Sequence, residues 1–244
     1  MKYKILTLAA GLVAASSLSA SAAIIDLVNV GDSANDGGAI LTITAPGGTG
    51  SGSFGSFDRF GGNHSGLSQG MNTDLDKYLD NKPPAGPGQF TRDIQGSAVQ
   101  VVDGFYLFRF DGGNPGNGLL TLQTIKLFVS GTQATSFAQL DAIRAGAPTW
   151  QTSNIYNVKN QSGNGIADMF LQIPQNLIGD SDYIYLYTES GGEPYADAGT
   201  YNEWAFLERT STPPPPSVPD AGATMMLLGM GLVAVEGLRR KLSA

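Results

Sequence analysis

Residues 97–131 read SAVQVVDGFYLFRFDGGNPGNGLLTLQTIKLFVSG and contain the clearest strand pattern in the chain. Two apolar runs flank the glycine-rich segment Gly112–Gly118, and in both runs apolar side chains recur at every second position. This period of two places alternate side chains on opposite faces of a strand. Arg109 and Asp111 lie on the polar face of the first run. The apolar positions are Phe108, Phe110, Leu120, Leu122, Leu127 and Val129. We therefore predict a β-hairpin with a long loop.

Other segments extend the same strand pattern. Residues 183–187 read YIYLY, with tyrosines on one face and Ile184 and Leu186 on the other, which is typical of a central sandwich strand. Residues 201–208 predict a last strand, and 22–30 and 39–44 predict early ones. Residues 136–146 are the best short-helix candidate, ended by glycine. The glycine-rich residues 47–70 read as a loop or irregular strand whose Phe54, Phe57 and Phe60 reach the core.

Composition agrees with this assignment. Glycine accounts for 33 of 244 residues, and charged residues make up only 14%. Few charges and many glycines favour a β-rich fold with many turns over a helical bundle. We predict an all-β fold, an antiparallel β-sandwich of jelly-roll type, with a helical segment at each end of the chain.

Both ends carry the signals of an exported protein. Lys2 and Lys4 precede an apolar run, and Ala20 and Ala22 form an A-x-A site before Ala23. This order is typical of a secretory signal peptide, here residues 1–22, cleaved before Ala23.

The last segment of the chain consists of three parts. Residues 211–217 form a proline-rich spacer, and residues 221–235 carry no charge. Arg239, Arg240 and Lys241 follow, where the positive-inside rule would hold them in the cytoplasm. The apolar run is near the lower length limit for a membrane helix. We predict a single transmembrane helix within residues 218–244.

This tail resembles the PEP-CTERM class of bacterial sorting signals, and the sequence of its motif is most similar to the VPDSG-CTERM variant. The motif residues are Val218, Pro219, Asp220, Ala221 and Gly222, with alanine at the position of the variant's serine. The resemblance implies recognition by an exosortase-like membrane protease, cleavage near the motif, and release or attachment at the cell surface. Proteins of this class often accompany exopolysaccharide production.

The middle of the chain, residues 23–210, offers little chemistry. There is no cysteine, and the one histidine, His64, cannot build a histidine-based metal site. Residues 66–70 match G-x-S-x-G but lack the strand, helix and later histidine that a hydrolase needs. Without the two ends, nine basic residues stand against nineteen acidic ones, a net charge of −10, which argues against nucleic acid.

These observations predict a non-enzymatic, exported protein of the cell surface or extracellular matrix that passes through the inner membrane and needs no cofactor. A carbohydrate-binding module acting on exopolysaccharide is the alternative, and a secreted glycan hydrolase is a distant third. Structural calcium stays open, with Asp180, Asp182 and Asp197 as the first acids to inspect. Candidate sugar-contacting aromatic residues lie near loops or strand ends, and they are Trp150, Tyr156, Tyr195 and Tyr201.

Overall fold

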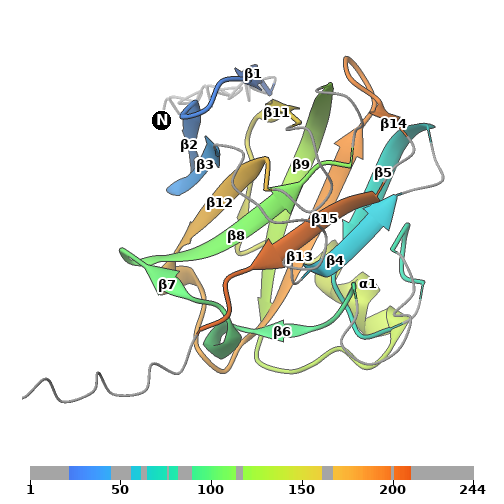
Figure 1. The fold of residues 1–244 in the computed structure, drawn as a ribbon. Helices are drawn as coiled ribbons and strands as arrows, with labels where there is room; N and C mark the ends of the chain where they lie inside the picture. The colour runs from blue at the N-terminus through green and yellow to red at the C-terminus, as the bar shows by residue number, and fades with distance from the viewer. Residues whose placement is uncertain are drawn as a thin grey trace, which may run out of the picture. The chain divides into compact units, whose positions relative to one another are not determined.

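The computed structural model describes residues 22–44, 56–61, 65–75, 77–81, 90–113, 118–160, 167–198 and 201–209. A compact unit ends at Leu207, and the chain from Glu208 onward forms a separate unit. Within the described residues the compact unit contains two β-sheets, one α-helix and two short 3₁₀ turns (Figure 1). The 3₁₀ turns are Gly96–Ala98 and Gln175–Leu177.

Sheet 1 has eight strands in the described part of the chain, six of them in the order β1-β11-β9-β13-β5-β14. The parallel pair β1 and β11 lies at one edge, and every other described pair in this sheet is antiparallel. The strands are β1 (Ile24–Leu27), β11 (Ile155–Lys159), β9 (Leu119–Ser130), β13 (Tyr183–Gly191), β5 (Ser65–Met71), β14 (Asp197–Ala198), β10 (Trp150–Gln151, paired with β9) and β6 (Ile94–Gln95, paired with β13).

Sheet 2 has seven described strands, all antiparallel, six of them in the order β2-β3-β12-β8-β15-β4. They are β2 (Ser33–Asp36), β3 (Ala39–Ile43), β12 (Met169–Pro174), β8 (Phe105–Asp111), β15 (Tyr201–Phe206), β4 (Ser56–Gly61) and β7 (Val101–Val102, paired with β8). In Figure 1, β8, β15 and β4 cross in front of β9, β13 and β5. The all-β prediction is therefore confirmed, with two sheets as expected of a sandwich.

The main core fills the space between the sheets. Alternate residues of β8 and β15 are fully buried there, including Phe108, Phe110 and Trp204, and the rings of Phe110 and Trp204 lie 4.8 Å apart. Polar bonds also cross between the sheets. Trp204 Nε1 donates to Thr188 Oγ1 at 2.9 Å, and the Asn202 amide donates to Ser190 Oγ at 2.9 Å. These bonds fix the sheets against each other because each buried donor requires its acceptor.

A second cluster covers the outer face of sheet 1. The helix α1 (Phe137–Ala145) begins after Ser136, whose side chain accepts from the Gln139 amide, and ends at Gly146. Its Leu140 packs with Tyr185 and Tyr187, whereas Ile184 and Leu186 of the same strand face the main core. The helix and the two-faced strand β13 are confirmed as predicted.

The predicted hairpin at residues 97–131 is wrong. Both strands exist as β8 and β9, but β8 pairs with β12 and β15 in sheet 2, and β9 pairs with β11 and β13 in sheet 1. The connection after Gly112 therefore crosses from one sheet to the other. An alternating pattern identifies a strand's buried face, but it does not identify its neighbour.

Two further strands lie where we expected a loop or irregular strand. Residues 56–61 and 65–71 form β4 and β5, and Phe57 and Phe60 are fully buried, as predicted. One glycine of this segment, Gly70, is required by packing. A Cβ at Gly70 would lie 2.3 Å from Phe60 Cγ, so only glycine leaves room for that ring.

In the part of the chain that the structure describes, no helix is long and apolar enough to cross a membrane. The predicted signal peptide up to Ser21 and the predicted transmembrane tail lie outside the described residues.

Candidate functional site

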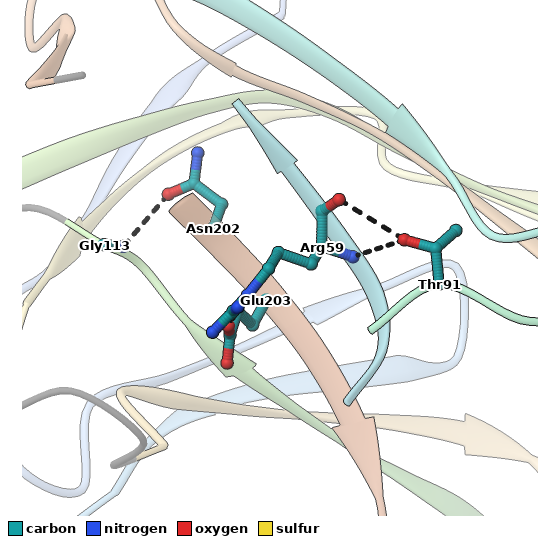
Figure 2. A network of polar contacts seen from close by, with 5 residues as sticks. All are labelled: Arg59, Thr91, Gly113, Asn202 and Glu203. Carbon is teal, nitrogen blue, oxygen red and sulfur yellow. Dashed lines mark hydrogen bonds and ion pairs between the residues drawn. The ribbon is translucent and has the colours of Figure 1, made fainter. Parts of the chain in front are cut away.

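The outer face of sheet 2 carries the most distinctive group of side chains. In β15, Glu203 pairs in register with Arg59 of β4 on one side and Asp111 of β8 on the other. Arg59 and Glu203 form an ion pair, and Figure 2 shows their two side chains overlapping in the view. We call this surface the arginine face and define it by Arg59, Phe90, Arg109, Phe170, Tyr201 and Glu203.

Aromatic rings flank both arginines of this face. The Arg59 guanidinium lies 3.8 Å from the centre of the Phe90 ring and 5.3 Å from that of Tyr201. The Arg109 guanidinium lies 5.7 Å from the centre of Phe170, its register neighbour in β12. Such contacts stabilise a cation while holding it in a fixed orientation.

Short backbone links hold the edge of this face. Thr91 Oγ1 accepts from the Arg59 amide at 3.2 Å and donates to the Arg59 carbonyl at 3.4 Å. The Arg92 amide donates to the Phe57 carbonyl at 2.8 Å. At the far end of β15, Asn202 accepts from the Gly113 amide at 3.1 Å (Figure 2). The segment 90–92 therefore covers the edge strand β4, which would otherwise expose unpaired backbone groups.

The two arginines differ in pairing. Arg59 has its carboxylate partner, but Arg109 has no ion pair or hydrogen bond to its side chain among the described residues. The Nε atom of Arg109 is sealed from water without an acceptor, and burial lowers the pKa of this side chain. A buried N–H that loses water without gaining an acceptor is costly, so Arg109 carries an unsatisfied donor at Nε.

Asp58 is a buried carboxyl without a hydrogen-bond partner among the described residues. It lies on β4 opposite Trp204, its exposure is 0%, and neither of its oxygens has a donor. Burial raises the pKa of Asp58 well above its usual value, so the neutral acid is the favoured form inside the sandwich. No pattern in the sequence distinguishes Asp58 from the exposed acids.

Asp36 is also buried but is fully satisfied. It accepts from the Ser153 amide and the Tyr156 hydroxyl, both at 2.8 Å, and from the Ser153 hydroxyl at 2.5 Å. Burial alone would raise its pKa, but these hydrogen bonds outweigh burial and lower it. Asp36 thus ties the end of β2 in sheet 2 to the chain entering β11 in sheet 1, a structural role.

A pair of carboxylates faces one amide near α1. Gln133 Nε2 donates to Asp74 at 3.0 Å and to Asp93 at 2.9 Å. Burial, partly offset by the hydrogen bond from Gln133 and reinforced by the Asp74 charge, raises the pKa of Asp93 to about 6. Among the described residues no cluster of three or more metal-ligating side chains is found.

The acids that we selected for calcium do not come together. Asp180 and Asp182 lie in the turn before β13, where Asp182 accepts from the Gly179 amide at 2.7 Å. Asp197 pairs with Gly66 next to the far end of β13. Asp180, Asp182 and Asp197 therefore lie at opposite ends of β13 and cannot bind one calcium ion together. Calcium binding elsewhere stays a prediction.

The structure separates the four candidate aromatics. Trp150 and Tyr156 are 6% and 0% exposed, so their rings cannot contact a sugar. Tyr195 is 38% exposed and Tyr201 is half-buried on the arginine face. Ser68 of the G-x-S-x-G match is fully buried inside strand β5 rather than at an exposed turn, and His64 lies outside the described residues.

The predicted processing residues fall mostly beyond the described part. Ala22 and Ala23 are exposed at its beginning, and the Ala23 carbonyl accepts from the Ile155 amide at 2.9 Å. Ala20, the motif residues 218–222 and the basic residues 239–241 lie outside it.

Comparison with known proteins supplies the evidence for this tail. Residues 217–242 match the family model of the VPDSG-CTERM motif. This tail is a VPDSG-CTERM sorting motif. The VPDSG-CTERM tail implies an exported protein that passes through the membrane and is processed by an exosortase-type enzyme. No curated protein and no solved structure matches the chain.

Proposed function

We propose that this chain is a non-enzymatic, exported protein of the cell surface or extracellular matrix. Its signal peptide is removed before Ala23, and its tail spans the inner membrane as a single helix until an exosortase-like protease cuts near residues 218–222. The observation that carries the proposal is the match of residues 217–242 to the VPDSG-CTERM motif. It is supported by the order of the parts, since the compact unit ends at Leu207, before the spacer and motif.

We further propose a jelly-roll-like topology for the body. The support is that successive long strands alternate between sheets, from β8 in sheet 2 to β9 in sheet 1, then β12, β13 and β15.

The proposal is tested by blocking the cut. The double substitution Pro219→Ala and Asp220→Ala should leave the chain in the inner membrane of a host with an exosortase, visible as a larger species on an immunoblot of membrane fractions. The matched control Pro213→Ala and Pro214→Ala changes the spacer and should be processed normally. Equal processing of both variants would contradict recognition of the motif.

Carbohydrate binding is the second candidate, and one observation favours it. The arginine face combines half-buried aromatic rings with charged side chains on the outer face of sheet 2. Aromatic rings offer apolar faces on which sugar rings pack, while neighbouring polar groups fix orientation.

A further inference from the structure

Arg109 is the arginine of this face whose side chain has no ion pair or hydrogen bond among the described residues. Its Nε is sealed from water with no acceptor, while the side chain as a whole stays partly exposed. A guanidinium presents several donors in a planar fork that matches a carboxylate. The part of this fork that reaches solvent is therefore free to bind an anion.

The neighbours of Arg109 shape this position. Phe170 on one side gives it a ring contact, and Ala205 on the other, 2% exposed, offers no acceptor side chain. Asp111 lies two residues along β8 on the same face, but no ion pair joins it to Arg109 among the described residues. The carboxylate of Glu203, two residues from Ala205 on the same face, is committed to Arg59. The two arginines of one face thus divide into a paired and an unpaired member.

The strands below this face limit the kind of ligand. β12, β8 and β15 each have paired strands on both sides, so they offer no free backbone edge to an extended peptide. Recognition must come from side chains standing on the sheet. A ligand with ring-shaped apolar faces and regularly placed carboxylates fits aromatic and arginine side chains in this arrangement.

We propose that the arginine face binds a carboxylate-bearing, acidic polysaccharide, with the Arg109 guanidinium holding a uronate carboxylate and Phe170 packing on the sugar ring. The body carries a net negative charge, so general electrostatic attraction does not recruit this ligand. Binding depends on the local arginine. The inference rests on the carbohydrate-binding candidate above and adds the ligand's charge and its receptor.

The test is calorimetric titration of the full-length chain, in mild non-ionic detergent, with an oligomer of galacturonic acid. Arg109→Gln should weaken binding at least about tenfold, because hydrogen bonds to a charged group are lost. Arg109→Lys should retain part of the affinity, since it keeps the charge without the fork. Phe170→Ala should weaken binding severalfold.

Arg144→Gln is the matched control. Arg144 lies on α1 beside Asp141, and α1 covers the other sheet, so this variant should bind within about twofold of the wild type. The fold of Arg109→Gln is checked by its unfolding transition without ligand, which we expect to lie close to that of the wild type because glutamine keeps a polar group at the position of Nε.

Three results would overturn the inference. The first is unchanged affinity in Arg109→Gln. The second is equal or tighter binding of poly-L-glutamate, which would assign the face to a peptide. The third is binding of neutral oligosaccharides that Arg109→Gln leaves intact, which keeps carbohydrate binding but removes the acidic ligand. Failure to bind any glycan would defeat both the inference and the carbohydrate-binding candidate.

Discussion

At the scale of single residues, the buried acids of this sandwich divide into satisfied and unsatisfied members. Asp36 collects hydrogen bonds from Ser153, Asn154 and Tyr156, whereas Asp58 has none. The same chemical group therefore stabilises the fold at one position and burdens it at the other. The sequence does not distinguish them, because the partners of Asp36 are more than a hundred residues away along the chain.

Replacing Asp58 by asparagine should stabilise the protein, increasingly so as pH rises. The pKa of Asp58 is raised in the folded state, so its effect on folding is most favourable below the unfolded pKa near 4, where the acid is neutral in both states, and the folded state loses stability as pH rises toward the folded pKa. Between these two pKa values, the free energy of unfolding of the wild type should decrease relative to that of Asp58→Asn by up to about 1.4 kcal/mol per pH unit.

The measurement is urea unfolding at several pH values, followed by fluorescence of the buried Trp150 and Trp204. Asp103→Asn, in the exposed turn between β7 and β8, is the control and should show no such widening. A constant difference between Asp58→Asn and the wild type from pH 4 to 7 would contradict burial of an unpaired acid.

Replacing Asp36 by asparagine should destabilise the protein, in contrast to the same replacement at Asp58. The variant keeps one acceptor oxygen and loses charge-assisted bonds, so we expect a loss of about 2–3 kcal/mol in the free energy of unfolding near neutral pH. The pKa of Asp36 is lowered, so its contribution is present above the unfolded value and disappears as pH falls through the folded one. The difference in free energy of unfolding between the Asp36→Asn variant and the wild type should therefore become smaller at low pH. Urea unfolding of both proteins at pH 7 and at pH 3 measures this difference.

At the scale of elements, strand identity was easier to predict than strand pairing. The long runs at β8, β9, β13 and β15 follow the alternation of their sequences, and α1 has a serine at its start and a glycine at its end. The hairpin error arose because Gly112 and the residues after it look like a turn whether the chain folds back or crosses between sheets. Pairing depends on partners that local sequence does not show.

A bulge also escaped the sequence pattern. Thr124 of β9 pairs with Glu189, but the next partner of β13, Ser190, pairs with Leu122, leaving Gln123 as the extra residue. The side-chain Nε2 of Gln123 donates to the Gly191 and Glu193 carbonyls at 3.0 and 2.9 Å. The bulge explains why the residues of β9 that face the main core change from the even positions Leu120 and Leu122 to the odd positions Ile125 and Leu127.

A substitution at Gly70 tests how closely β5 packs against β4. Gly70→Ala should destabilise the protein by about 1–3 kcal/mol or more, because the new methyl group would overlap the Phe60 ring. Gly131→Ala is the matched control, since a Cβ there meets no atom within 4 Å, and it should change stability by less than about 1 kcal/mol. Similar urea midpoints for the two variants would contradict the close contact of Gly70 with Phe60.

At the scale of the whole molecule, the ends carry the address and the middle carries the fold. The sequence predicted the C-terminal motif and the β-rich body, because a motif and strand alternation are local properties, while the signal peptide at the other end stays a prediction. It did not predict the arginine face, which joins Arg59, Arg109 and Glu203 from three strands. Only the predicted polar face of residues 105–111 pointed to Arg109.

The central claim is that this chain is exported and then cut at both ends, and intact-mass analysis of the protein from its native host tests it most directly. We predict a mature species that begins at Ala23 and ends near residues 218–222, with the folded body complete in between. A mature species that still contains Arg239 and Arg240, or that begins at Met1, would contradict the account.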